Sequence, residues 1–146
     1  MAETLIRSSG VNNAVEDVSI DDFMTGLIAG LAHLNVPVVS IRDNQFYKAV
    51  VDAFNTFEID AANASVRPRF WLRLNKIYGD SPPVRDALTR AVQRDLVSLD
   101  NPEYQDMRLK LGRGDADLYL DKLVGGPDLY IDLARNFLRS YSSYAS

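Results

Sequence analysis

Residues 78–111 decide the fold class of this chain, and they have the sequence YGDSPPVRDALTRAVQRDLVSLDNPEYQDMRLKL. Ser81-Pro82-Pro83 predicts the start of a helix that runs to about Asp95, because serine caps a helix and proline needs no amide donor in the first turn. Three segments then predict a β-hairpin: an apolar run at 96–99, a turn-forming cluster at 100–103 and an alternating run at 107–111. The centre of the fold is therefore a helix that leads directly into a two-stranded hairpin.

Two amphipathic helices are predicted before this unit. The first covers residues 20–34, where apolar side chains recur at helical spacing and Ser19 with Asp22 forms a capping box. The second covers residues 44–58, with Asp43 as its cap and a wide aromatic stripe. The stripes of both helices are expected in the core, and their main residues are Phe23, Leu27, Leu31, Phe46, Val50, Phe54 and Phe57.

The connecting segments give weaker signals. A valine-rich stretch at 36–41 is expected to pair as a small strand or simply to cross over, and residues 61–66 are expected to form a linker. The pattern at 69–78 fits a helix, but it also fits a strand through Phe70, Leu72 and Leu74, so both alternatives stay open. After the hairpin, two more helices are predicted, at 115–124 with Asp115 as its cap and at 128–141.

Length and composition predict one globular domain. The chain has 146 residues, 47% of them hydrophobic and 25% charged, which is close to the average for folded soluble proteins. It contains no cysteine, so disulfide frameworks, thiolate metal sites and thiol nucleophiles are excluded. No apolar run approaches the roughly 18 residues of a membrane span, and residues 1–19 lack the pattern of a signal peptide. We therefore expect a cytoplasmic protein without membrane contact, with a tail at 1–18 and a single helical domain at 19–146.

The formal net charge of −4 conceals an uneven distribution. Residues 1–60 contain 3 basic and 9 acidic side chains, residues 61–113 contain 10 and 6, and residues 114–146 contain 3 and 5. A basic centre thus lies between acidic ends. The overall negative charge argues against broad electrostatic binding of nucleic acid, whereas the basic centre still permits contact through one face.

A helix that leads directly into a two-stranded hairpin is the layout of a winged helix, in which the helix docks in a DNA groove and the hairpin is the wing. The stretch from Tyr78-Gly79 through Leu96-Val97-Ser98-Leu99 to Met107-Arg108-Leu109 resembles that unit. In particular, it resembles the winged-helix modules of bacterial antitoxin-like proteins of the Panacea type, which have a tyrosine-glycine turn, a helix, a leucine-valine strand and a wing. The expected fold class is mainly α with a small β-hairpin, namely a winged-helix-like core over about 20–111 with extra C-terminal helices over 115–141.

The solvent face of the helix at 82–95 is the candidate nucleic-acid-binding surface. The residues assigned to it are Arg85, Thr89, Arg90, Gln93 and Arg94. Arginine, threonine and glutamine contact base edges and phosphates in protein–DNA complexes. The alternative is a solvated helix face on which Asp86 and Arg90 form an i,i+4 ion pair. The predicted wing tip weighs against DNA, because the charge of its acidic side chains would repel phosphate, and they are Asp100, Glu103 and Asp106.

No catalytic residue, metal ligand, cofactor or small-molecule substrate is predicted. The sequence contains no glycine-rich phosphate loop, nucleophile elbow or HExxH motif. The i,i+4 carboxylate pairs Asp117/Asp121 and Asp128/Asp132 have ligand atoms suited to Mg²⁺ or Ca²⁺, but a solvated helix face is the favoured interpretation. His33 lies near the end of the first helix, where the helix dipole favours a cation, and this placement is preferred to a catalytic role.

Three hypotheses for function follow, and none is enzymatic. The first is a protein-interaction module, antitoxin-like or adaptor-like, that recognises a partner protein through the acidic ends. The second is a sequence-specific DNA-binding winged-helix regulator that uses the face from Arg85 to Arg94. The third is a structural assembly subunit, as in a filament or virion, with an ordered N-terminal tail that packs on neighbouring copies. A partner protein or a second copy of the chain is thus the expected partner, with DNA as the alternative.

Overall fold

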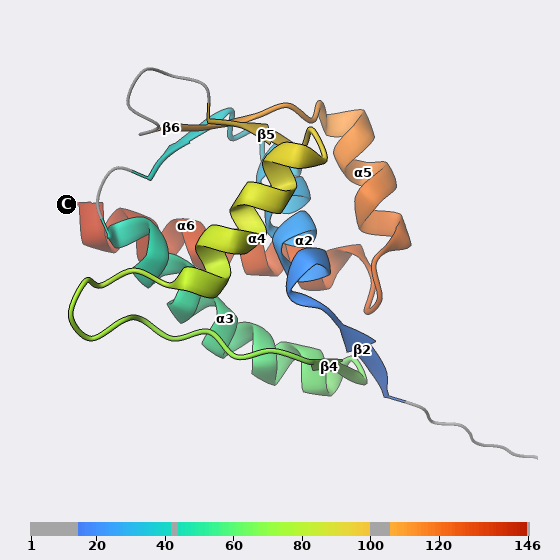
Figure 1. The fold of residues 1–146 in the computed structure, drawn as a ribbon. Coiled ribbons are helices and arrows are strands. Elements are labelled where there is room, and N and C mark those ends of the chain that lie inside the picture. The colour runs from blue at the N-terminus through green and yellow to red at the C-terminus, as the bar shows by residue number, and fades with distance from the viewer. Residues whose placement is uncertain (1–14, 42–43, 100–105, 146) are drawn as a thin grey trace, which may run out of the picture.

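Helix α2 (Ile20–His33) lies at the centre of a mainly helical fold, which the computed structural model describes over residues 15–41, 44–99 and 106–145 (Figure 1). It packs against three other helices, α4 (Pro82–Gln93), α5 (Arg113–Lys122) and α6 (Pro127–Ala145). All residues of α2 from 23 to 32 are buried. The side chain of Ser19 accepts a hydrogen bond from the amide of Asp22 at 3.1 Å, so the predicted helix and its N-cap are confirmed.

Two glycines let α6 lie directly against α2. A Cβ atom at Gly26 would lie 2.1 Å from the Tyr130 ring, and one at Gly30 would lie 2.6 Å from the Tyr130 carbonyl oxygen. Both positions therefore require glycine. The Tyr130 ring is fully buried, and its hydroxyl donates a hydrogen bond to the Val124 carbonyl at 2.6 Å. Burial, followed by the charge of Asp22, raises the pKa of Tyr130, which keeps the phenol protonated as a donor.

Helix α3 (Gln45–Asn63) is longer than predicted. Its N-cap residue is Asn44, whereas the expected cap, Asp43, lies outside the described residues. The helix continues to Asn63, so the linker predicted at 61–66 is wrong in its first half. Ala61 is fully buried, and alanine has the highest helix propensity, which together explain the extension. The predicted aromatic stripe lies against the core: Phe46, Val50, Phe54 and Phe57 are buried, and its other two residues, Tyr47 and Val51, are partly buried.

A three-stranded antiparallel sheet combines β3 (Val38–Ser40), β5 (Val97–Ser98) and β6 (Asp106–Leu109). Strand β6 is central, because it pairs with β3 on one side and with β5 on the other. The predicted hairpin is confirmed, and so is the strand alternative for the valine-rich stretch. The turn residues predicted at 100–103, with Asp100 and Glu103, lie outside the described residues.

A second, two-stranded sheet joins β2 (Glu16–Val18) to β4 (Val66–Pro68) in parallel. The register places Glu16 opposite Val66 and Val18 opposite Pro68. Val18 and Val66 are both buried in the core. The last residues of the predicted tail at 1–18 thus form a strand that pairs within the domain, and residues 1–14, on which the hypothesis of an ordered tail depends, lie outside the described residues.

Residues 69–80 form neither the helix nor the regular strand predicted for 69–78. The amide of Arg69 makes the last backbone bond to β2, donating to the Val18 carbonyl at 3.0 Å. Beyond it the side chains still alternate as in a strand, with Phe70, Leu72 and Leu74 partly or fully buried and Arg69, Trp71 and Arg73 exposed. The alternation exists without a second strand to pair with, because β2 ends at Val18 and the chain then enters α2.

The two C-terminal helices lie close to their predicted positions. Helix α5 begins at Arg113, so Asp115 lies in the first turn and the predicted cap at Asp115 is wrong; the N-cap is Gly112. Gly125 and Gly126 have φ angles of 90° and 87°, and they separate α5 from α6. No helix in the described ranges is both long and apolar enough to cross a membrane.

Replacing Gly26 by alanine tests the contact between α2 and α6. The added methyl group would overlap the Tyr130 ring, and overpacking of this kind costs about 1–3 kcal/mol of unfolding free energy. Urea denaturation followed by circular dichroism measures the loss. The control is Gly114→Ala on α5, where an added Cβ meets no atom within 4 Å and the midpoint should not fall. Equal midpoints for wild type and Gly26→Ala would contradict the close contact.

Candidate functional site

The five residues predicted to bind nucleic acid all lie on α4 or at its end, away from the side that packs on the core. The buried side of α4 consists of Val84, Ala87, Leu88 and Ala91. Arg85, Thr89 and Gln93 recur every fourth residue and are exposed, so they form one outward stripe. Arg90 and Arg94 lie beside this stripe. The structure therefore separates the five residues into an outward group and a group directed at α2.

The side chains of Arg90 and Arg94 bind α2. Arg90 Nε donates a hydrogen bond to Asp21 Oδ1 at 2.7 Å, in an ion pair whose side chains are 42% and 41% exposed. Arg94 donates to the hydroxyl of the buried Thr25 at 2.9 Å, and that hydroxyl donates to the Asp21 carbonyl at 2.8 Å. Arg90 thus has Asp21 as its ion-pair partner, and not Asp86 as the sequence pattern predicts. These two arginines connect α4 to the first turns of α2.

The outward stripe also makes local contacts. Arg85 forms an ion pair with Asp80, just before α4. The Thr89 hydroxyl donates to the Arg85 carbonyl at 3.1 Å, as serine and threonine often do within helices. Gln93 is exposed. Arg85, Thr89 and Gln93 are thus the members of the predicted surface that face solvent without contacting α2.

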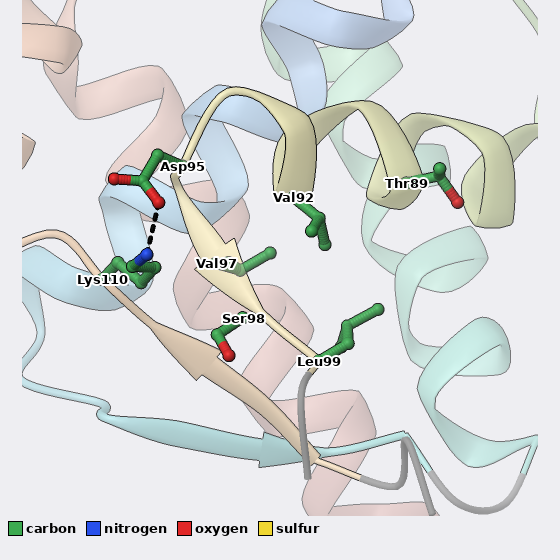
Figure 2. Close-up of a pocket in the computed structure, with 7 residues that line it drawn as sticks. All are labelled: Thr89, Val92, Asp95, Val97, Ser98, Leu99 and Lys110. Carbon is green, nitrogen blue, oxygen red and sulfur yellow. Dashed lines mark hydrogen bonds and ion pairs between the residues drawn. The ribbon is translucent and has the colours of Figure 1, made fainter.

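A shallow pocket lies between α4 and the hairpin (Figure 2). Thr89 and Val92 line it from α4, and Val97, Ser98 and Leu99 line it from β5 and the residue that follows. The ion pair between Lys110 and Asp95 lies at one end of it. Thr89 is the member of the predicted surface that lines this pocket, so helix and hairpin share one small concave surface.

Residues 67–78 combine exposed apolar side chains with basic ones, and we call them the basic segment. Three of its large apolar side chains are mostly exposed: Trp71 at 75%, Ile77 at 83% and Tyr78 at 71%. Four basic side chains and no acidic one occur in the same segment, and they are Arg67, Arg69, Arg73 and Lys76. Both arginines near β4 form ion pairs with Asp17: Arg67 Nη2 lies 3.3 Å from its Oδ1, and Arg69 Nε lies 3.9 Å from its Oδ2. The alternation in RFWLRL, residues 69–74, is the sequence signal that could have identified the outward face.

The basic segment is anchored to the core by Phe70. Its ring lies 5.4 Å from that of Phe23 and 5.2 Å from that of Phe54, measured between centroids. Leu72 is 5% exposed. Trp71 between them points outward, with a shallow hollow on each side, one formed with the arginines at 67 and 69 and the other with Glu58 and neighbouring residues of α3. The exposed Trp71 side chain is therefore attached to a backbone that its two neighbours, Phe70 and Leu72, hold against the core.

A hydrogen-bonded turn fixes the end of the basic segment. The Asn75 side chain accepts hydrogen bonds from the amides of Ile77 and Tyr78 at 2.8 and 2.9 Å. The Gly79 amide donates to the Asn75 carbonyl at 2.8 Å, and Gly79 has a φ of 73°, which favours glycine. The Asn44 side chain, before α3, donates to the Tyr78 carbonyl at 2.5 Å. Ile77 and Tyr78 are thus exposed on a turn whose backbone has a defined shape.

Helix α5 has a second exposed apolar group. Leu118 is 60% and Tyr119 is 38% exposed. Both line a shallow hollow, together with Leu111, Asp115 and Lys122. This group lies in the acidic C-terminal part of the chain, where sequence reasoning placed a partner-binding surface but named no residue.

Several carboxylates lie on or near α5, and some of them have partners. Asp117 Oδ1 lies 2.7 Å from His33 Nδ1, at the end of α2, so one member of the predicted i,i+4 pair has a side-chain partner. Asp121 and Asp128 line a hollow next to this pair. Within the described residues, no group of three or more acidic, histidine or cysteine side chains is arranged to hold a metal ion.

Comparison of the chain with protein-family models, with curated proteins and with solved structures finds no match. The structure itself defines the class: a mainly helical domain with a small antiparallel sheet.

A double-mutant cycle tests the partner of Arg90. Asp21→Asn, Arg90→Gln and the double variant should give a coupling of about 0.2–1 kcal/mol in unfolding free energy, as half-exposed ion pairs do, and this coupling should shrink at high salt. The matched cycle of Asp86→Asn with Arg90→Gln should give no measurable coupling. Coupling to Asp86 and none to Asp21 would contradict the structure.

Proposed function

We propose that this chain is a non-enzymatic protein-interaction module, antitoxin-like or adaptor-like, which binds a partner protein through the basic segment and not through the acidic ends suggested by the sequence. One observation carries the proposal: Trp71, Ile77 and Tyr78 are each mostly exposed on one segment whose backbone is held by Phe70 and the Asn75 turn. Tryptophan, tyrosine and arginine are the residues that dominate binding energy at protein interfaces. The partner surface would be acidic, with an apolar centre.

The fixed shape of the basic segment supports binding over a purely structural role. Large apolar side chains on a flexible loop lose conformational entropy when a partner binds, and this weakens the complex. Here Phe70 and Leu72 are packed into the core, while Asn44 and Asn75 hold the turn. The backbone that carries the exposed side chains is therefore already ordered, which lowers the entropic cost of docking.

A winged-helix architecture is part of the same proposal. The elements occur in the order α2, β3, α3, β4, α4, β5, β6, and the sheet order β3-β6-β5 puts the last strand in the middle. The order of helices and of the three strands supports a winged helix, whereas residues 64–81, which include β4, replace the short turn that joins the two helices of a helix-turn-helix. The proposed relation to antitoxin-like proteins of the Panacea type rests on the residues quoted for it at 78–111.

The second candidate is the DNA-binding regulator, and the element order just described is the observation that favours it. Against it, Arg90 and Arg94 contact α2, and Arg85 is paired with Asp80. Fewer cations are then available for phosphate, and affinity for DNA depends on how many phosphates are neutralised.

We expect random duplex DNA to bind no more tightly than about 10⁻⁴–10⁻⁶ M at physiological salt, the usual range for non-specific contact. An electrophoretic shift with genomic fragments of the host measures this affinity. Nanomolar binding that is weakened by Arg85→Ala or Gln93→Ala, with folding unchanged, would instead favour the regulator.

Protein binding is tested with Trp71→Ala. The tagged wild-type chain, incubated with host lysate, should retain a partner in near-stoichiometric amount, and Trp71→Ala should retain at least tenfold less, because the central aromatic anchor is missing. The control is Ile59→Ala on α3, which removes another exposed apolar side chain (66% exposed) outside the basic segment. Equal retention by all three proteins, or no retained protein at all, would count against the proposal.

A further inference from the structure

The two exposed apolar groups belong to different parts of the chain. In Figure 1, the loop between β4 and α4, which contains residues 69–78 of the basic segment, runs past α3, whereas α5 lies beyond α2 and α4. Only the β4 end of the segment lies near the connection between α5 and α6, where a Cβ at Gly125 would lie 3.0 Å from Val66. Leu118 and Tyr119 are themselves exposed, as are Trp71, Ile77 and Tyr78, so neither group covers the other within one chain.

The charges of the two parts are complementary. The basic segment, residues 67–78, contains four basic and no acidic side chains. Residues 115–132, which cover most of α5 and the first turns of α6, contain five aspartates and one lysine. Asp117 and Asp132 have His33 and Arg135 as partners, and Asp115 lies in the hollow with the apolar pair. Opposite charges around two apolar centres favour association of one part with the other.

One surface has an exposed ring and the other has a hollow. The hollow on α5 is lined by Leu111, Leu118 and Tyr119, together with Asp115 and Lys122. The Trp71 ring is 75% exposed on the basic segment, with the exposed Arg73 two residues further along the chain. An aromatic ring and an arginine on one surface are thus matched by apolar side chains and a carboxylate on the other.

We propose that the occupant of the basic segment is α5 of a second copy of this chain, so that copies associate head to tail. This inference rests on the proposed function, because it names the partner of the same surface. Since the two surfaces are different parts of the chain, one contact leaves the basic segment of one copy and α5 of the other copy free. A head-to-tail contact of this type continues into a ring or an open filament.

Self-association can be followed with the only tryptophan of the sequence, Trp71. As the concentration of the wild-type chain rises, sedimentation velocity should show species larger than a dimer, and the Trp71 emission should shift to shorter wavelength as the ring leaves water. Raising the salt concentration should weaken both changes, because the contact is partly electrostatic. The control Ile59→Ala should behave as the wild type.

A pair of complementary variants gives the decisive test. Ile77→Glu alters the basic segment and Leu118→Arg alters α5; both side chains are largely exposed, so folding, checked by circular dichroism, should be unchanged. Each variant alone should associate at least tenfold more weakly than the wild type. Mixed together, they should form a 1:1 dimer and nothing larger, because one intact contact remains. Only the Trp71 of Leu118→Arg should shift its emission in that dimer.

Two results would overturn the inference: a wild-type chain that stays monomeric at all concentrations, and variants that assemble as the wild type does. A monomeric wild type that still retains a host protein through Trp71 would remove the head-to-tail contact and leave the proposed function intact. If the wild-type chain neither self-associates nor retains a host protein through Trp71, the head-to-tail contact and the proposed function are both rejected.

Discussion

The close contact between α2 and α6 is the constraint on which the rest of the structure depends. Because Gly26 and Gly30 have no side chains, Tyr130 of α6 fills the space beside α2. The Phe57 ring of α3 lies 5.8 Å from that of Tyr130, and the Phe23 ring of α2 lies 5.2 Å from that of Phe57. The Phe23 ring also contacts the Phe70 ring of the basic segment. The position of the basic segment therefore depends, through this chain of ring contacts, on the close approach that Gly26 and Gly30 allow.

Helices and hairpin were predictable because their signals are local. Ser19 with Asp22, and the proline start at Ser81-Pro82-Pro83, are signals between neighbouring residues, so the pattern alone locates α2 and α4. Ser81 occupies the N-cap position as predicted, but its side chain makes no capping hydrogen bond. The end of α3 was missed because the burial of Ala61 depends on tertiary packing. The segment at 69–80 was ambiguous because a strand pattern does not show whether a second strand is available to pair with it.

The candidate site was predictable only in part, and for the same reason. Helical spacing correctly places Arg85, Thr89 and Gln93 on the exposed side of α4. It cannot show that Arg90 and Arg94 reach Asp21 and Thr25, which are 69 residues away in the chain. The exposure of Trp71 likewise depends on Phe70 and Leu72 being buried on either side of it, which the alternating pattern permits but does not require.

The backbone of residues 70–74 has no backbone hydrogen-bond partner among the described residues, although its side chains are anchored. Amide hydrogen exchange depends on hydrogen bonding and on access of water, and not directly on how well a segment is ordered. These amides should therefore exchange with solvent deuterium as fast as those of a loose loop. This segment, whose Phe70 ring is packed against the core, would then resemble an unstructured loop in an exchange experiment. A measurement of side-chain mobility at Phe70 and Leu72 would show that the segment is ordered.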